Sequence, residues 1–305
     1  MIAVTGATGN VGGELVRMLV SAGERVTAIS RRPASPERAS PEDAVSAEDA
    51  ASPGESGSYG EGASPGAGGS DPGVIRRRGD LAEPAGLGEA LDGAKALFLL
   101  VAGDDPQGIL GQAEAAGVEK VVLLSSQGAG TRPRAYPHPA AFEAAVRGSG
   151  LDWTILRPGG FASNAYAWAE GVRTRRAVAA PFGDVGLPVI DPSDIAEVAA
   201  AVLRQAGHGG RVYELTGPEA VTPRDRAALI GEALGEPVAF TEQTREEARA
   251  QMLTFMPEPV VEATLAILGE PSEAERAVSP DVARVLGREP RSFADWATRN
   301  LAAFR

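Results

Sequence analysis

Short apolar runs alternate with amphipathic segments along the first two thirds of the chain. The expected strands cover residues 2–4, 25–30, 74–78, 96–101, 121–124, 151–156 and 211–216, and the expected helices residues 84–91, 106–116, 140–148 and 193–205. The run over residues 96–101 is apolar throughout, as is typical of a central parallel strand with both faces covered. Strands that alternate with helices at this spacing form a parallel sheet with right-handed crossovers. The pattern therefore predicts an α/β fold with a doubly wound parallel sheet.

A glycine-rich turn follows the first strand. Gly6, Gly9 and Gly12 lie in the run TGATGNVG, which leads from the apolar strand into an amphipathic helix. In that setting the first glycine permits a tight turn, the second lets backbone amides approach a pyrophosphate, and the third lets the helix pack on the strand. The helix N-terminus, with its free N–H groups and positive dipole end, favours the phosphates. We expect a dinucleotide-binding, Rossmann-type domain; the alternative is a glycine-rich turn without a ligand.

The adenosine end of the dinucleotide is expected where the second and third strands end. A site that prefers NAD(H) places an Asp or Glu after the second strand to bind the ribose 2′-hydroxyl. Here the sequence reads Ser30-Arg31-Arg32, and two cations suit a 2′-phosphate. We therefore expect NADP(H) to be preferred over NAD(H), unless the pair is only a solvated strand edge. Asp80, after the third strand, either accepts a hydrogen bond from adenine or caps the following helix.

Small and polar residues follow the later strands. The fourth strand ends at Ala102, which leaves space for a cofactor ribose, and the fifth leads into Ser125, Ser126 and Gln127. Ligands bind outside the carboxyl ends of the strands in such sheets, so we expect these residues in one crevice. Residues 157–164, RPGGFASN, form a sharp turn, or corner, in which two glycines leave space, and this corner can surround the nicotinamide.

Two stretches depart from the alternation of strands and helices. From about residue 33 to 73 the composition changes to Ala, Ser, Pro, Gly and Glu, which bury too little apolar surface to offset ordering entropy. We expect a disordered insertion there. Residues 217–305 contain helix starts such as Thr222-Pro223 and read as a smaller, mainly helical region. The predicted organisation is an NAD(P)-binding domain over residues 1–216 and a C-terminal substrate-binding region over residues 217–305.

Composition and charge limit the classes of partner that the chain is expected to bind. A formal net charge of -12 argues against direct nucleic-acid binding, which needs clustered Lys and Arg. The apolar run over residues 96–102 is far too short to span a membrane, and Met1 leads directly into the first strand, leaving no room for a signal peptide. The absence of cysteine excludes disulfides and thiolate chemistry and fits a cytoplasmic protein. With His138 and His208 as the only histidines, no metal site is expected.

Seven segments together resemble one family. They read TGATGNVG, SRRP, GDL, ALFLL, LLSSQGA, SGLDWTILRPGGFASN and DPSDIAEVAA. In these segments the chain resembles the NmrA-like group of atypical short-chain dehydrogenases/reductases, which includes NADPH-dependent quinone reductases and triphenylmethane reductase. The segments span nearly the whole chain apart from residues 33–73, and they do not identify a substrate.

The resemblance implies a set of cofactor-binding residues. Those for the pyrophosphate are Gly6, Thr8, Gly9, Asn10 and Val11; those for the adenosine phosphate are Arg31 and Arg32; Asp80 and Leu81 flank adenine; and Val101, Ala102, Pro158, Gly159 and Phe161 surround the ribose and nicotinamide.

The catalytic centre departs from the usual pattern. Short-chain dehydrogenases use Tyr-x-x-x-Lys, in which the lysine lowers the pKa of the tyrosine so that its hydroxyl can donate a proton to a carbonyl. No lysine stands four residues after any tyrosine of this chain, and Phe142-Glu143 occupies the place where family members often carry the lysine. A carboxylate cannot lower a neighbouring pKa as a cation does. The usual alcohol–ketone chemistry is therefore not predicted.

Two functions are compatible with these residues. The first and favoured one is an NAD(P)H-dependent reductase of small electrophiles that need little acid catalysis: quinones, conjugated cations, iminium-like compounds or enones. Hydride transfer would rest on proximity and orientation, with Ser126, Tyr136 or His138 hydrogen-bonding the acceptor, although Tyr136 and His138 also read as an ordinary proline-bounded loop. The second is a non-enzymatic redox sensor that binds NADP(H) and acts through a regulatory protein partner. A sugar-nucleotide epimerase needs the missing Tyr/Lys pair, and a homodimer is left open.

Overall fold

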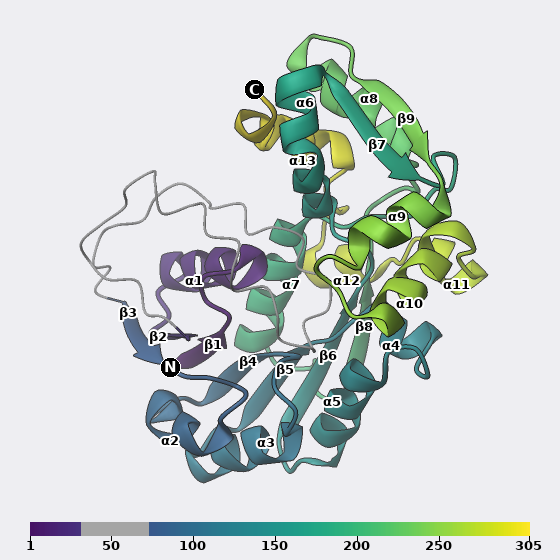
Figure 1. Cartoon of the computed structure of the whole chain (residues 1–305). Coiled ribbons are helices and arrows are strands. Elements are labelled where there is room, and N and C mark those ends of the chain that lie inside the picture. Colours follow the sequence, from purple (N-terminus) through teal and green to yellow (C-terminus); the bar gives the residue numbers. More distant parts are fainter. Residues whose placement is uncertain (32–72) are drawn as a thin grey trace.

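The central sheet is the doubly wound parallel sheet predicted from the sequence. The computed structural model describes residues 1–31 and 73–305, so the insertion expected over residues 33–73 lies outside the described residues except for Gly73. The strands are β1 (Ile2–Thr5), β2 (Val26–Ser30), β3 (Val74–Arg78), β4 (Ala96–Leu100), β5 (Lys120–Leu124), β6 (Asp152–Pro158) and β8 (Arg211–Leu215). In the described residues these seven strands are all parallel, in the order β3-β2-β1-β4-β5-β6-β8 (Figure 1). The order reverses between β1 and β4, which is where ligands of such sheets bind.

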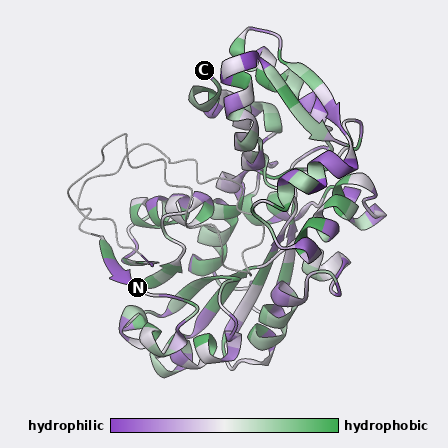
Figure 2. Cartoon of the chain, in the orientation of Figure 1, coloured by the Kyte–Doolittle hydropathy of each residue, from purple (hydrophilic) through white to green (hydrophobic). Residues whose placement is uncertain are grey.

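Helices cover both faces of the sheet. One face carries α1 (Asn10–Ser21), α7 (Pro192–Arg204) and α12 (Asp281–Leu286), and the other carries α2 (Leu87–Leu91), α3 (Pro106–Ala115) and α5 (Pro137–Gly148). Successive side chains of a strand point to opposite faces, so Val4 and Phe98 pack under α1 and α7 while Ala3 and Leu99 pack against the other layer. Figure 2 shows the inner strands as largely hydrophobic, as two covered faces require, and the edge strand β3 as hydrophilic.

Local sequence signals account for the helix boundaries. Asp191 caps α7 by accepting a hydrogen bond from the Ser193 backbone N–H at 2.9 Å, and Pro192 occupies the first helical position. The helix α5 begins at Pro137, three residues before the predicted start. Proline fixes a helical φ and needs no N–H partner in the first turn, so Pro137 and Pro139 extend the helix backwards.

A second, smaller unit lies at the top of Figure 1 and includes the C-terminus of the chain. It contains a two-stranded parallel sheet of β7 (Ala177–Pro181) and β9 (Ala239–Gln243). The other helices in the described part of the chain, in either unit, are η2 (Pro84–Gly86), α4 (Gln127–Thr131), η3 (Ala162–Trp168), α6 (Ala169–Arg175), α8 (Pro223–Leu234), α9 (Arg245–Met252), α10 (Glu258–Gly269), α11 (Glu273–Arg276), α13 (Phe293–Arg299) and η4 (Leu301–Phe304). The hydrophobic core of the second unit contains Ala162 and Val178 as well as Ile230 and Trp296, so this unit includes residues before and after position 216. The division at residues 216 and 217 stays a prediction.

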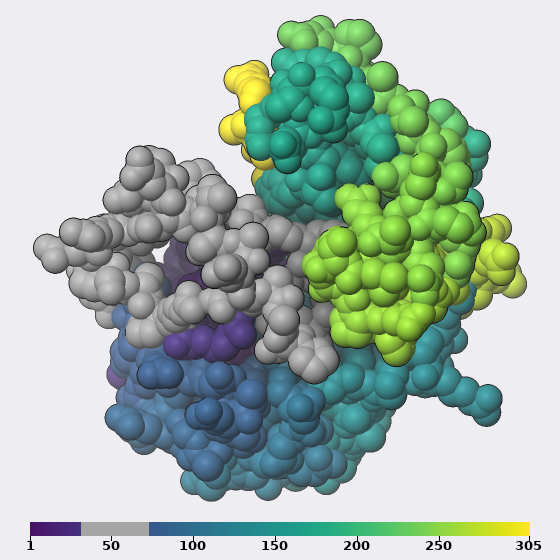
Figure 3. Space-filling model, in the orientation of Figure 1, coloured from purple at the N-terminus to yellow at the C-terminus, as the bar shows by residue number. Residues whose placement is uncertain are grey.

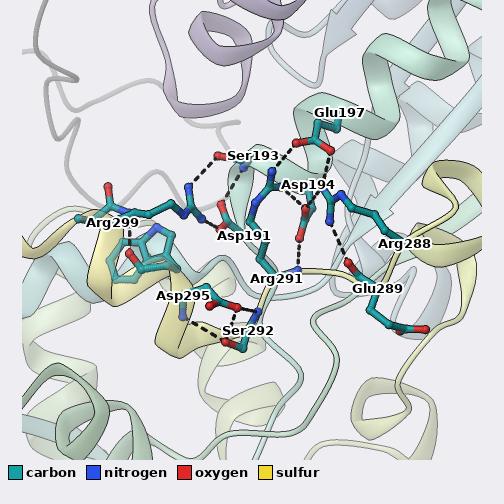
Figure 4. Close-up of polar contacts among 12 residues, drawn as sticks. Asp191, Ser193, Asp194, Glu197, Arg288, Glu289, Arg291, Ser292, Asp295 and Arg299 are labelled. Carbon is teal, nitrogen blue, oxygen red and sulfur yellow. Dashed lines mark hydrogen bonds and ion pairs between the residues drawn. The ribbon is translucent and has the colours of Figure 1, made fainter. Parts of the chain in front are cut away.

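A network of charged residues fastens the end of the chain to the sheet domain (Figure 4). Its acidic members are Asp191, Asp194 and Glu197, and its arginines are Arg288, Arg291 and Arg299. Asp194 is fully buried and accepts hydrogen bonds from Arg288 Nη2 at 2.7 Å and from the Arg291 backbone N–H at 2.6 Å. Burial alone would raise the pKa of Glu197, but hydrogen bonds from Arg291 and Arg288 hold it below its ordinary value. The segment that leads into α13 is thereby attached to α7.

Within residues 1–31 and 73–305, no helix combines the length and the apolar character that crossing a membrane would need.

We expect Asp194→Ala to lower the free energy of unfolding by about 3–5 kcal/mol, because it removes the fully buried carboxylate of the network and leaves Glu197 alone to pair with two partly buried guanidinium groups. Urea denaturation measures the loss. The matched control is Arg284→Ala, since Arg284 pairs with Asp281 at 3.0 Å but its side chain is 70% exposed. The control should cost less than about 1 kcal/mol. Equal effects of the two substitutions would show that the network contributes no more than a surface pair.

Candidate functional site

The turn after β1 brings α1 very close to the sheet. Gly6 has a φ of +60°, and a Cβ there would lie 2.2 Å from Leu100 Cδ1. A Cβ at Gly12 would lie 2.1 Å from the carbonyl oxygen of Gly6. Both glycines are therefore required by the fold, as the motif predicts: one for a left-handed turn and one for a close helix–strand contact.

Gly9 has a different role from its two neighbours. It is the N-cap of α1 in an extended conformation, and no side chain caps the helix. A Cβ at Gly9 would come no closer than 3.5 Å to another atom, the Gly6 carbonyl oxygen, so the fold does not need a glycine there. The bare position leaves the uncapped amides of the first turn open to an anion. Val11 is buried in the core, so only its backbone can face a phosphate, whereas Thr8 is exposed and Asn10 partly exposed.

The ends of β1 and β4 are joined at the point where the strand order reverses. The Thr5 hydroxyl donates to the Phe98 carbonyl at 2.9 Å and accepts from the Leu100 N–H at 3.0 Å. The loop after β4 then turns at Gly103, whose φ is +76° and whose Cβ would lie 2.2 Å from the Leu81 carbonyl oxygen. The structure thus brings Leu81 next to the loop that carries Val101 and Ala102, which are distant from it in the sequence.

Sequence reasoning missed a cation at the carboxyl ends of β2 and β3, where the adenosine end of the cofactor is expected. Ser30, at the end of β2, pairs in register with Arg78 of β3, and Arg78 is exposed. Arg31 follows Ser30 directly, and the predicted Arg32 lies outside the described residues. The run VIRRR was interpreted only as a strand, and the register between β2 and β3, which places Arg78 beside Ser30, is not visible in the sequence.

Asp80 organises the turn after β3. Its Oδ1 accepts from the Ala82 N–H at 2.9 Å, and its backbone carbonyl accepts from the Glu83 N–H at 3.1 Å. The cap of the next helix, η2, is Glu83, which makes no side-chain capping bond. The carboxylate therefore stabilises the turn and does not cap the helix, and the adenine contact stays a prediction.

A buried ion pair occupies the place where the family often carries a lysine. Glu143 of α5 accepts two hydrogen bonds from Arg157, with Nε–Oε1 at 2.8 Å and Nη2–Oε2 at 2.7 Å, and one from the Ser125 hydroxyl at 2.7 Å. Burial alone would raise the pKa of Glu143, but the hydrogen bonds from Arg157 and Ser125 hold it below its ordinary value. Glu143 therefore stays ionised, and the Ser125 hydroxyl is committed to it.

The three predicted catalytic side chains lie at the starts of α4 and α5, and each makes different contacts. Ser126 caps α4 by accepting from the Gly128 N–H at 3.2 Å, and it is partly exposed. Tyr136 packs its ring against Gly128, where a Cβ would lie 2.7 Å from Tyr136 Cδ2. Burial raises the pKa of Tyr136, although a hydrogen bond with the Thr264 side chain works against this. His138 donates from Nε2 to the Gly103 carbonyl at 2.7 Å.

The corner after β6 is held from two sides. The Gly159 N–H donates to the Leu215 carbonyl of β8 at 2.9 Å, which extends the sheet past Pro158. Phe161 forms an isolated bridge with Ile190, which precedes the cap of α7. The predicted residues of this corner are thus fixed by backbone contacts to strands and loops on either side.

Two side chains of the sheet domain hold the helices that follow α9. Arg132 donates to both carboxylate oxygens of Glu275 at 2.8 Å, and Gln127 Nε2 donates to the Ala274 carbonyl at 3.4 Å. Burial alone would raise the pKa of Glu275, but hydrogen bonds from Arg132, the Ser272 N–H and Thr131 hold it at about 2. Figure 3 shows the light green surface of α9 and α10 between the upper unit and the sheet domain. These anchors were also missed from the sequence.

Comparisons with known proteins match the whole chain. An NAD(P)H-binding family model matches residues 69–206, and the NAD dependent epimerase/dehydratase family model matches residues 2–114. The chain is 35% identical to a (4-alkanoyl-5-oxo-2,5-dihydrofuran-3-yl)methyl phosphate reductase of Streptomyces griseus, over 100% of this chain and 99% of that protein. It is 30% identical to the NAD(P)H azoreductase of Xenophilus azovorans, with the same shares covered. A structure of an Escherichia coli NADPH-dependent quinone oxidoreductase with NADPH shares the fold, with a TM-score of 0.74, 24% identity and 98% of this chain and 99% of that chain covered.

We expect Gly9→Ala to raise the Kd for NADPH at least about tenfold, because the added methyl group stands where the pyrophosphate must approach. Calorimetric titration measures the Kd. Gly13→Ala is the matched control, since its Cβ would also lie 3.5 Å from a backbone carbonyl, that of Ala7, but on the next turn of α1. Equal affinities of the two variants for NADPH would show that the Gly-rich turn is not part of the cofactor site.

Proposed function

Because the chain belongs to the NmrA-like group of atypical short-chain dehydrogenases/reductases and is an NAD(P)H-dependent oxidoreductase, we propose that it reduces small conjugated electrophiles, above all enones activated by a second carbonyl group. The observation that carries this proposal is the ionised Glu143, held by Arg157 and Ser125 where a Tyr-x-x-x-Lys enzyme needs its cation. The similarity to whole-length reductases favours this function over a non-enzymatic sensor.

The name of the Streptomyces griseus relative describes an acceptor of this kind. In a 4-alkanoyl-5-oxo-2,5-dihydrofuran the ring double bond joins carbons 3 and 4, and carbon 4 is bonded to both carbonyl carbons. A hydride added to carbon 3 leaves a negative charge that both carbonyl oxygens share, and a water proton can then be added at carbon 4. Such an acceptor stabilises its own charge, whereas a simple ketone yields an alkoxide that needs a proton donor.

The residues of this chain would bind and orient the reactants. When bound, the nicotinamide supplies the hydride. The uncapped first turn of α1, which begins after Gly9, would hold the pyrophosphate, and the corner at Pro158, Gly159 and Phe161 would hold the nicotinamide against the loop after β4. Orientation of two reactants in one site is itself a large contribution to rate.

Ser126 is the side chain best placed to bind the acceptor. Its oxygen already accepts the Gly128 N–H, its hydroxyl hydrogen has no acceptor in the part of the chain that the structure describes, and the residue is partly exposed. It can therefore donate to a carbonyl oxygen of the acceptor. The Tyr136 hydroxyl lies against Thr264, and His138 Nε2 is bonded to Gly103, so we assign these two to positioning of α10 and of the loop after β4.

Ser126→Ala should lower kcat/KM for a doubly activated enone about tenfold, the value of one hydrogen bond. Tyr136→Phe should keep kcat/KM within about threefold, because no proton passes through its hydroxyl. Ser126→Thr retains both the cap and the hydroxyl and is the control for a purely structural loss at α4. If Tyr136→Phe abolished turnover while Ser126→Ala did not, the assignment of the two residues would be reversed.

The preference for NADP(H) is proposed to rest on Arg31 and Arg78. Arg31 follows the end of β2, and Arg78 lies opposite Ser30 in the register of β2 and β3, so two cations border the position of a 2′-phosphate. Charge-assisted hydrogen bonds from arginine to phosphate are among the stronger polar contacts in proteins.

Arg31→Ala and Arg78→Ala should each raise KM for NADPH about tenfold and leave KM for NADH within about twofold. Steady-state kinetics with the two cofactors measure this. Arg76→Ala is the control, because Arg76 shares the face of Arg78 but pairs with Ala28, two residues back from the strand end. A parallel loss for NADPH and NADH would refute a 2′-phosphate contact.

A further inference from the structure

The short helix α4 of the sheet domain is held at its carboxyl end by helices from the C-terminal part of the chain, which lie above it in Figure 1. Arg132, the C-cap of α4, donates from Nε and Nη2 to the two carboxylate oxygens of Glu275 in α11, each at 2.8 Å. Its Nη2 also donates to the Glu270 carbonyl, directly after α10, at 2.8 Å. The Thr131 hydroxyl donates to Glu275 Oε1 at 2.8 Å. The position of α11 therefore determines where α4 ends.

The Glu275 carboxylate is itself fixed within α11. Its side chain is 1% exposed, and its Oε2 accepts from the Ser272 N–H at 2.8 Å in the capping box of that helix. Each carboxylate oxygen thus accepts two hydrogen bonds, one of them from Arg132. A bidentate pair of a guanidinium and a carboxylate has a defined geometry and is stronger than a neutral hydrogen bond. The contact therefore fixes both the position and the orientation of α4 relative to α11.

α4 also fits closely on the sheet domain beneath it. A Cβ at Gly128 would lie 2.7 Å from Tyr136 Cδ2, and a Cβ at Gly130 would lie 2.3 Å from Arg157 Nη1. The helix spans only Gln127–Thr131, so little more than one helical turn separates its two ends. A displacement of the carboxyl end is therefore carried to the amino end.

The amino end of α4 lies beside the corner that would hold the nicotinamide. Gln127 is the first residue of the helix, and a Cβ at Gly159 would lie 3.5 Å from its Oε1. Gln127 Nε2 also donates to the Ala274 carbonyl of α11 at 3.4 Å. Ser126, the N-cap, directly precedes Gln127 and is partly exposed. One end of this helical turn thus borders the proposed reaction site, and the other end is bonded to Glu275.

We propose that Glu275 is a positioning residue of the acceptor site, which through Arg132 sets the place of α4 and with it the place of the Ser126 hydroxyl; this inference rests on the proposed reductase function. Glu275 touches neither reactant. It acts on the rate through the orientation of the acceptor, to which the reaction between two bound reactants is sensitive. The C-terminal helices thereby take part in catalysis through one buried carboxylate.

The first test compares Glu275→Gln with Glu197→Gln. Both carboxylates accept hydrogen bonds from arginines, but Glu197 lies on α7, and its partners Arg288 and Arg291 follow α12. We expect Glu275→Gln to lower kcat/KM for a doubly activated enone about fivefold to tenfold and to keep the Kd for NADPH within about twofold, because the Gly-rich turn is on another element. Glu197→Gln should leave both constants within about twofold. Equal values of kcat/KM in the two variants overturn the proposal.

A double-mutant cycle separates action through Ser126 from a general structural loss. If Glu275 acts through Ser126, the double variant Ser126→Ala with Glu275→Gln should match Ser126→Ala in kcat/KM within about twofold. Losses that multiply would show that the two residues act independently and overturn the positioning role. Arg132→Lys keeps the charge but loses the bidentate contact, and it takes the place of Glu275→Gln in the cycle if that variant does not fold.

The last measurement needs no turnover. Hydrogen exchange of the peptide that covers residues 126–132 reports the opening of α4, whose Gly128 N–H donates to Ser126 Oγ. We expect exchange at least about tenfold faster in Glu275→Gln than in the wild type and in Glu197→Gln. Unchanged exchange overturns the positioning of α4. If the wild type reduces no acceptor while exchange still depends on Glu275, the proposed function fails and the coupling of α11 to α4 is supported.

Discussion

The close contact between α1 and the end of β1 determines the cofactor end of the molecule. A side chain at Gly12 would meet the carbonyl of Gly6 at 2.1 Å, and one at Gly6 would meet Leu100 at 2.2 Å, so either would force the helix away from the sheet. Because the helix stays close, its uncapped amides lie over the point where the strand order reverses, beside the hydrogen bonds of Thr5 that join β1 to β4. The later strands end at the same edge, which is why residues from β4, β5 and β6 share one site.

A second constraint is electrostatic and defines the chemistry. The carboxylate of Glu143 is fixed by Arg157 and Ser125, so α5 offers an ionised acid at the position where the Tyr-x-x-x-Lys pattern places its lysine. Tyr136 lies against Gly128 and faces Thr264 of α10. Arg132 with Glu275, and Asp194 with its arginines, then hold the smaller unit and its helices over the sheet domain. In the proposed function, this site positions an acceptor that stabilises its own charge.

Local patterns in the sequence were sufficient to predict the fold and the cofactor. The spacing of Gly6, Gly9 and Gly12, the apolar runs and the cap at Asp191 each act within a few residues, and the doubly wound sheet follows from them. Contacts between distant segments were not predictable. Arg78 lies opposite Ser30 only through strand register, and Asp194 pairs with Arg291 across 97 residues of chain. The paired strands β7 and β9 were likewise missed, because two short strands lie among helix signals and are joined only by folding.

In the proposed reaction, hydride reaches a conjugated acceptor without a proton donated by the protein. The direct measurement is the single-turnover rate of NADPH oxidation by a doubly activated enone, in H₂O and D₂O, between about pH 6 and about pH 9. We expect a rate that does not change with pH and a solvent isotope effect close to one. A rate that falls with an apparent pKa inside that range, together with a solvent isotope effect above about two, would show a protein acid in the rate-limiting step and contradict this proposal.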